Sequence, residues 1–155
     1  MVFKSEKGLS DAELRAALEE YVDERMTRLA EQRRESGRDA GGRVRVLMLP
    51  PDFTRMYSGA GHITAMLTEI FAARAEEIEW DVMPALGTHV PMSREECETF
   101  FEGRVDYEKL LVHNWRDDVV KIGEVPGEFV SEVSEGLVST PIDVEVNRRI
   151  VSGDY

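Results

Sequence analysis

Four side chains that suit anion binding and proton transfer lie in two short loops of this sequence. Asp52, Thr54 and Arg55 fall in the first loop, and His89 falls in the second. An arginine can fork onto a carboxylate or a phosphate, and an aspartate can orient it or accept a hydrogen bond from a hydroxyl group. Histidine is the natural general acid or base near neutral pH. These residue types predict a crevice that binds a small anion and moves a proton.

Both loops follow a segment with the pattern of a β-strand. Residues 44–49 are apolar and β-branched, as in a buried strand. Residues 77–83 alternate apolar and charged side chains, as in a half-exposed strand at a sheet edge. Because the carboxyl ends of parallel strands share one edge of a sheet, we expect the two loops to meet there. The alternative is a salt-bridged turn without a ligand.

A helix is predicted directly after the first loop, beginning between Gly59 and His62. Its apolar residues recur at helical spacing: Ile63, Met66, Leu67, Ile70 and Phe71. The N-terminus of this helix would add backbone N–H donors to the crevice. The stretch 59–64 superficially matches a dinucleotide-binding fingerprint, but it starts too far from the preceding strand, so this signal is weak.

Further elements are predicted on either side of this unit. A capping box at 10–13 opens a helix to about Glu35, and another at 93–96 opens a short helix to about Phe101. Residues 109–113 have the pattern of a third strand. Strands that alternate with helices predict an α/β fold, a three-layer Rossmann-like domain with a mainly parallel sheet.

The C-terminal part has a different residue pattern from the alternating strands and helices before it. Residues 119–122 and 128–133 alternate apolar and polar side chains and are separated by Pro126 and Gly127, which predicts an antiparallel hairpin. Residues 144–151 are predicted to start a helix.

Charge and composition exclude several classes of partner. The 155 residues contain 19 Lys and Arg against 31 Asp and Glu, a net charge of −12, so neither nucleic acid nor an anionic membrane is an expected partner. The sequence has no apolar run long enough to span a membrane and no signal-peptide pattern, which predicts a cytoplasmic protein.

The other titratable residues show no second chemical motif. The single Cys97 cannot form an internal disulfide, and its acidic neighbours should raise the pKa of its thiol. His62 is expected to cap a helix or face solvent, and His113 to make a structural hydrogen bond beside Asp117 and Asp118. We find no paired spacing of metal ligands and no G-x-S-x-G motif, so neither a metal site within this chain nor a serine hydrolase is predicted.

Three blocks of the sequence, Pro51–Arg55, Ala85–Pro91 and His113–Asp118, together resemble the N-terminal domain of the nickel-dependent lactate racemase family. The D-x-T-R pattern followed by G-T-H is the specific part of this resemblance. The stretch Val146–Ile150 also resembles that family's chain just before its catalytic second half. The resemblance covers roughly residues 43–155 and leaves residues 1–42 as an N-terminal helical extension and linker.

The resemblance implies an activity and a set of site residues. The family interconverts the stereoisomers of 2-hydroxy acids with a nickel pincer cofactor built on a pyridinium mononucleotide. A hydride passes between substrate and cofactor, while histidines take and return the hydroxyl proton. By motif match, Asp52, Phe53, Thr54 and Arg55 would hold the cofactor, with Arg55 at its phosphate end, and His89 would be one of two acid–base histidines.

Two departures from the family pattern qualify this expectation. The family usually has proline after the arginine, where this chain has Met56. The second acid–base histidine, the lysine that tethers the cofactor and the nickel-binding histidine lie beyond the equivalent of Tyr155. We therefore expect a fragment or one subunit of a split enzyme, which is inactive and binds no cofactor without its C-terminal domain or a partner chain.

Two further interpretations stay open. The chain could be a non-catalytic module that binds a phosphate or carboxylate ligand through Arg55. It could also be a structural domain whose apolar face is covered by another chain.

Overall fold

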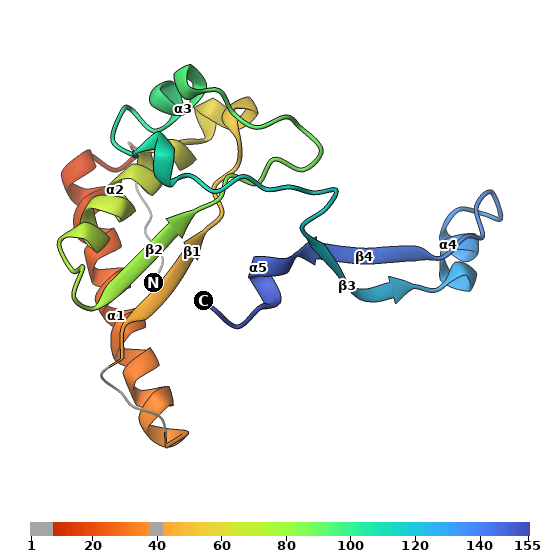
Figure 1. Cartoon of the computed structure of the whole chain (residues 1–155), viewed down its shortest axis with the longest axis horizontal. Helices are drawn as coiled ribbons and strands as arrows, with labels where there is room; N and C mark the ends of the chain where they lie inside the picture. The colour runs from red at the N-terminus through yellow and green to blue at the C-terminus, as the bar shows by residue number, and fades with distance from the viewer. Residues whose placement is uncertain (1–7, 38–41) are drawn as a thin grey trace.

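The computed structural model of the protein describes residues 8–37 and 42–155. A lobe of helices packed on a small sheet carries a long arm, which extends away from it (Figure 1). We call residues 119–147 the arm. The elements, in chain order, are α1 (Asp11–Glu35), β1 (Val44–Met48), η1 (Phe53–Ser58), α2 (Ala60–Ala72), β2 (Ile78–Val82), α3 (Arg94–Phe100), η2 (Tyr107–Lys109), β3 (Val119–Val125), α4 (Gly127–Val133), β4 (Ile142–Asn147) and α5 (Arg148–Val151).

Helix α1 forms as its capping box predicts. The backbone N–H of Ser10 donates to the Glu13 carboxylate at 2.8 Å, and the Ser10 hydroxyl accepts from the Glu13 N–H at 3.4 Å. The helix ends at Glu35, as predicted, with Ser36 as its C-cap. Its Val22 is only 5% exposed and belongs to the core of the lobe, so α1 packs against the α/β unit.

The sheet of the lobe is parallel and small. Strands β1 and β2 pair in register, with Val46 opposite Trp80. Phe71 of α2 packs on Trp80 with ring centroids 6.1 Å apart. The opposite face of the sheet is contacted by the last residue, because the Tyr155 hydroxyl donates to Asp81 at 2.6 Å. The architecture is thus mixed α/β with helices packed on a two-stranded parallel sheet.

The core of the lobe draws on α1, α2, α3 and both strands. Its buried residues are Val22, Met48, Ile70, Phe71, Ile78, Val82, Leu86, Met92, Cys97, Phe100 and Phe101. Helix α2 approaches α3 so closely at Gly61 that an added Cβ would lie 1.9 Å from the Phe100 carbonyl oxygen. Only glycine fits there. Helix α3 begins at its predicted capping box on Ser93.

The predicted third strand at 109–113 is wrong. Residues 107–109 form the short helix η2, capped by Asp106, whose carboxylate accepts the Glu108 N–H at 3.1 Å. Only Leu110 makes a parallel bridge to Val82. The local cap therefore keeps the chain helical until just before it reaches the sheet.

The predicted hairpin exists, but its second strand is residues 142–147 rather than 128–133. β3 pairs antiparallel with β4, whereas residues 128–133 lie in helix α4 at the tip of the arm. Pro126 precedes the first turn of α4, where its missing N–H leaves no hydrogen bond unmade. The predicted helix at 144–151 is also wrong over its first half. Residues 142–147 alternate with period two and form β4, and only α5 is helical.

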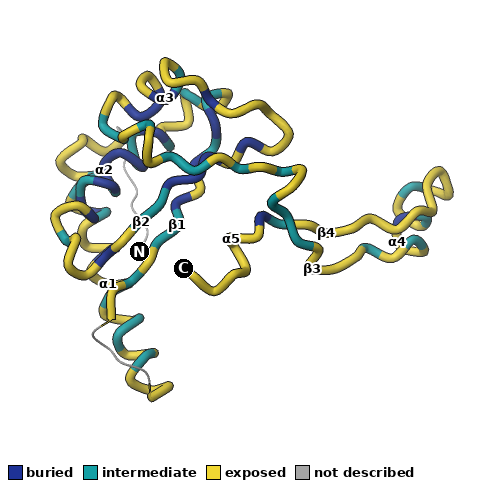
Figure 2. The backbone as a smooth tube through the Cα atoms, viewed as in Figure 1, coloured by how far each residue is buried: buried dark blue, intermediate teal, exposed yellow. Residues whose placement is uncertain are grey.

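Most of the arm is exposed to solvent (Figure 2). The buried exceptions are Val130 at its tip and Asn147 at its base. No helix in the described ranges is long and apolar enough to cross a bilayer.

Candidate functional site

The two predicted loops meet, because the parallel pairing continues beyond the strands. The Ala85 N–H donates to the Pro50 carbonyl at 2.7 Å, and Pro51 and Ala85 form a parallel bridge. This pairing places the start of η1 beside the loop that follows β2. The sequence prediction that both loops share one edge of the sheet is confirmed.

Asp52 is the centre of the site. Its side chain caps η1, and the residue is only 6% exposed. One carboxylate oxygen, Oδ1, accepts from the Thr54 N–H at 3.1 Å and from the Thr54 hydroxyl at 2.5 Å. The other oxygen, Oδ2, lies 2.5 Å from Nδ1 of His89. Burial opposes ionisation of this carboxyl group, but the hydrogen bonds from Thr54 and His89 outweigh it and hold the pKa of Asp52 below its ordinary value.

His89 is held by the loop that follows β2. Leu86 is buried in the core, Gly87 adopts a left-handed φ of 57°, and the His89 N–H donates to the Leu86 carbonyl at 2.9 Å. The turn points the imidazole back at Asp52. Because the ionised Asp52 accepts at Nδ1, that nitrogen carries a proton, and Nε2 is left as the nitrogen that can accept one. The His89 side chain is 54% exposed, so a ligand can reach it.

Arg55 lies next to this pair. Its backbone N–H donates to the Asp52 carbonyl at 3.0 Å, and its guanidinium contacts the Thr54 hydroxyl at 3.4 Å. Within residues 8–37 and 42–155 the guanidinium has no carboxylate partner. Phe53, by contrast, packs against the core and anchors the start of η1. Among the described residues, the site thus presents a guanidinium without a carboxylate partner beside an oriented imidazole.

The other two histidines make structural contacts. His62 Nδ1 lies 2.9 Å from Glu102, and its Nε2 lies 3.3 Å from Asp11. The hydrogen bond to Glu102 outweighs burial and raises the pKa of His62. His113 Nδ1 lies 3.1 Å from the Asn147 amide. This contact links the base of the arm, where Asn147 lies, to the chain that leads out of the lobe.

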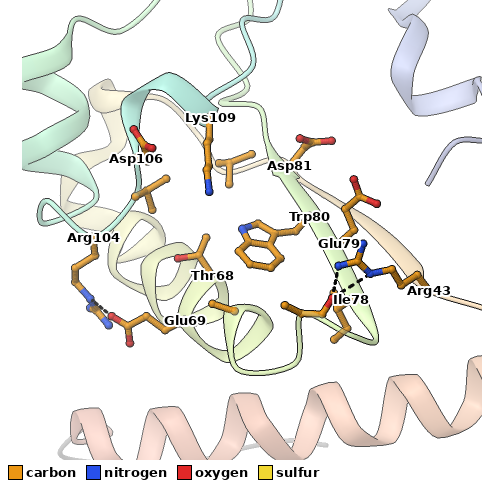
Figure 3. Close-up of a pocket in the computed structure, with 14 residues that line it drawn as sticks. Arg43, Thr68, Glu69, Ile78, Glu79, Trp80, Asp81, Arg104, Asp106 and Lys109 are labelled. Atoms are coloured by element: carbon orange, nitrogen blue, oxygen red, sulfur yellow. Dashed lines mark hydrogen bonds and ion pairs between the residues drawn. The ribbon is translucent and has the colours of Figure 1, made fainter.

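A separate cavity of about 500 Å³ lies on the β2 side of α2 (Figure 3). Trp80 lines it from β2, and Lys109 points into it from η2 (Figure 3). Asp52 and His89 do not line this cavity. No motif in the sequence predicts this cavity; the only local signal for it is Trp80, a tryptophan in the half-exposed strand pattern.

No group of three or more metal-binding side chains is present in the part of the chain that the structure describes. Cys97 is buried, and burial together with Glu96 raises the pKa of its thiol, as its acidic neighbours predicted. Its thiol is therefore a poor nucleophile.

Comparison with known proteins identifies the fold but no function. No protein-family model and no curated protein sequence matches this chain. The crystal structure of a protein from Thermotoga maritima is similar, with a TM-score of 0.71 and 22% sequence identity. The match covers 99% of this chain and 33% of the Thermotoga chain. This chain therefore spans about a third of the length of that protein, and the arm is included in the similarity.

Proposed function

We propose that this chain is the N-terminal, cofactor-cradling part of a lactate racemase-like enzyme that interconverts the stereoisomers of a 2-hydroxy acid. The observation that supports this most directly is the contact of 2.5 Å between Asp52 and His89. It joins the two motifs on which the resemblance to that family rests, although they are 37 residues apart.

The roles of the residues follow from their contacts. The buried Asp52 carboxylate holds the Nδ1 proton of His89, so Nε2 takes the proton of the substrate hydroxyl group and returns it. Arg55 would hold the phosphate of the nucleotide cofactor through a charge-assisted hydrogen bond.

The residues fit one end of the implied cofactor. The exposed guanidinium of Arg55 suits a phosphate, and Thr54 fixes Asp52 beside it. When bound, the nickel pincer nucleotide would supply the hydride acceptor. The described residues offer no cluster of ligands for the nickel itself. In this proposal the nickel ligand and the tethering lysine come from a C-terminal domain or a partner chain.

The proposal also concerns the rest of the protein. The Thermotoga protein of similar fold is three times as long as the matched region, which is consistent with a second half that completes the site. We propose that further strands beside Leu110 extend the sheet into a three-layer, Rossmann-like domain. Alone, the chain is then inactive.

The test uses the complete enzyme, assembled with its second half and loaded with cofactor. His89→Ala should lower the rate of racemisation by about 10²–10⁴-fold, since general acid–base catalysis contributes roughly that much. The absorbance of the bound cofactor should not change. Val90→Ala, an exposed neighbour, is the matched control. Retained turnover in His89→Ala would refute the catalytic role.

Arg55 also supports a second candidate function, a non-catalytic module for a phosphate or carboxylate ligand. Calorimetric titration of the isolated chain with nicotinic acid mononucleotide separates the two. Binding that Arg55→Gln abolishes and Arg116→Gln preserves would favour the module, whereas no heat at millimolar ligand would count against it. The racemase assay then decides whether chemistry occurs.

A further inference from the structure

The arm exposes apolar side chains that no described residue covers. Most of its residues are exposed to solvent along its length (Figure 2). Leu137 at the tip is 88% exposed, and the other exposed apolar residues of the arm are Ile122, Phe129, Val133, Val138, Ile142 and Val144. Ile142 and Val144 are alternate residues of β4, so their side chains lie on one face of the ladder. Exposed apolar patches mark interaction sites in soluble proteins.

The arm is also strongly acidic. Between residues 119 and 147 one lysine stands against six acidic residues, a net charge of −5. That lysine, Lys121, is already paired with Glu124 and Asp143, at 2.7 Å and 2.6 Å. The tip carries Glu128, Glu132 and no basic residue. A surface that covers the arm must therefore be apolar with a basic rim.

The lobe has such a surface. A groove of about 410 Å³ runs along β1 between α1 and the C-terminal residues. Its walls are apolar and include Leu47, Leu49 and Ile150, and Arg25 and Arg149 also line it. Arg25 has no carboxylate partner among the described residues.

The groove also contains an open strand edge. Val44 and Met48 of β1 make their backbone hydrogen bonds to the chain around β2, at 2.8 Å and 2.9 Å. In a parallel pair, alternate residues bond to the same neighbour, so the N–H and C=O groups of Arg45 and Leu47 point away from β2. No described residue pairs with this edge. An unpaired edge beside apolar walls suits the addition of an extended segment.

We propose that the arm of one copy docks in the β1 groove of a second copy, and that the second copy returns the same contact. The arm cannot fill the groove of its own chain, because it extends away from the lobe (Figure 1). The acidic, apolar arm matches the arginine-lined, apolar groove, although the net charge of −12 on each copy opposes association elsewhere. A two-fold axis would make both contacts equivalent.

Sedimentation velocity of the full chain at increasing concentration tests this proposal. The unmodified protein should form a reversible dimer. Phe129→Ser combined with Leu137→Ser should shift the association at least tenfold to higher concentration, since it removes apolar contact at the tip. Val90→Ser is the matched control, because Val90 is 81% exposed but lies outside both surfaces.

A mixing experiment separates arm exchange from any other dimer. The groove variant combines Arg25→Glu with Ile150→Ser and keeps an intact arm, whereas the arm variant keeps an intact groove. Each should be monomeric alone, and their mixture should form a heterodimer through one arm and one groove. All the changed residues are exposed, so both variants should fold, which circular dichroism checks.

Three results would overturn the proposal. The first is a monomer at every concentration, which would show that no second copy covers the arm. The second is a dimer that both variants leave unchanged. The third is the absence of a heterodimer in the mixture.

Discussion

The lobe and the arm are built from the same kinds of element but differ in what covers their apolar side chains. In the lobe, Phe101 and Ile78 are fully buried between helices and sheet. In the arm, Phe129 and Ile142 are more than half exposed. The backbone hydrogen bonds between β3 and β4 are its main internal contacts. An isolated two-stranded hairpin is marginal in water. The difference indicates that the buried core stabilises the lobe, whereas the exposed apolar side chains of the arm are available for contact with another surface.

The strongest test of this contrast truncates one phenylalanine in each region. Phe101→Ala removes a side chain that is 0% exposed and should lower the free energy of unfolding by about 3–5 kcal/mol. Phe129→Ala, at 54% exposure, should lower it by less than about 1 kcal/mol. Urea unfolding at a concentration where the chain is monomeric measures both. Equal losses would refute the contrast.

A pair of glycines sharpens the same comparison. Gly61→Ala forces a Cβ against the Phe100 carbonyl and should destabilise the lobe by about 1–3 kcal/mol. Gly123→Ala in β3 meets nothing within 4 Å and should be neutral or slightly stabilising. Thermal unfolding followed by circular dichroism compares the two. A neutral Gly61→Ala would mean that α2 and α3 can separate at no cost.

A cluster of ion pairs around Glu69 should make the stability of the lobe depend on pH in the acid range. Arg104 and Arg15 bond to Glu69 and lower the pKa of its carboxyl group from 4.5 to about 2. The stabilisation is therefore complete above pH 4.5 and lost as the pH falls towards 2. Glu69 is 40% exposed, so solvent screening limits the effect to about 1 kcal/mol.

The measurement is the difference in unfolding free energy between the protein and Glu69→Gln as a function of pH. We expect the difference to be largest near pH 7 and to shrink below pH 4.5. Glu108→Gln, from an exposed pair with Arg94, is the control and should change little at any pH. A constant difference for Glu69→Gln would contradict the assignment.

The smallest expected effect has the opposite pH dependence. The hydrogen bond to Glu102 raises the pKa of His62 above 6.5, so its stabilisation is complete below pH 6.5 and is lost as the pH rises through the raised pKa. His62→Ala should cost less than about 1 kcal/mol at pH 6 and still less at pH 9. Unfolding at both pH values checks the sign. A larger loss at pH 9 would exclude this role.

Much of the lobe could be predicted because its signals are local. The capping boxes at Ser10 and Ser93 start helices where expected, and the apolar spacing after Gly59 correctly predicts α2. Each of these signals depends on side-chain to backbone contacts within one turn, or on a repeat that a short segment contains. The same is true of the alternation in β2.

The predictions that are wrong concern segments whose structure depends on pairing with a distant strand. Residues 128–133 and 142–147 both alternate, and alternation alone does not say which of them pairs with β3. The cap on Asp106 likewise competed with the strand pattern at 109–113 and prevailed up to Lys109.

By itself, the sequence determined the three α-helices of the lobe (α1, α2 and α3), the two strands of its sheet and the residue types of the candidate site. Only the tertiary structure decided that His89 Nδ1 contacts Asp52, that Arg55 stays without a carboxylate partner in the described chain, and that β4 completes the arm. The physical reason is the difference in sequence separation between local and tertiary interactions. Caps and periodicity act over a few residues, whereas a contact between loops or strands depends on how the whole chain closes on itself.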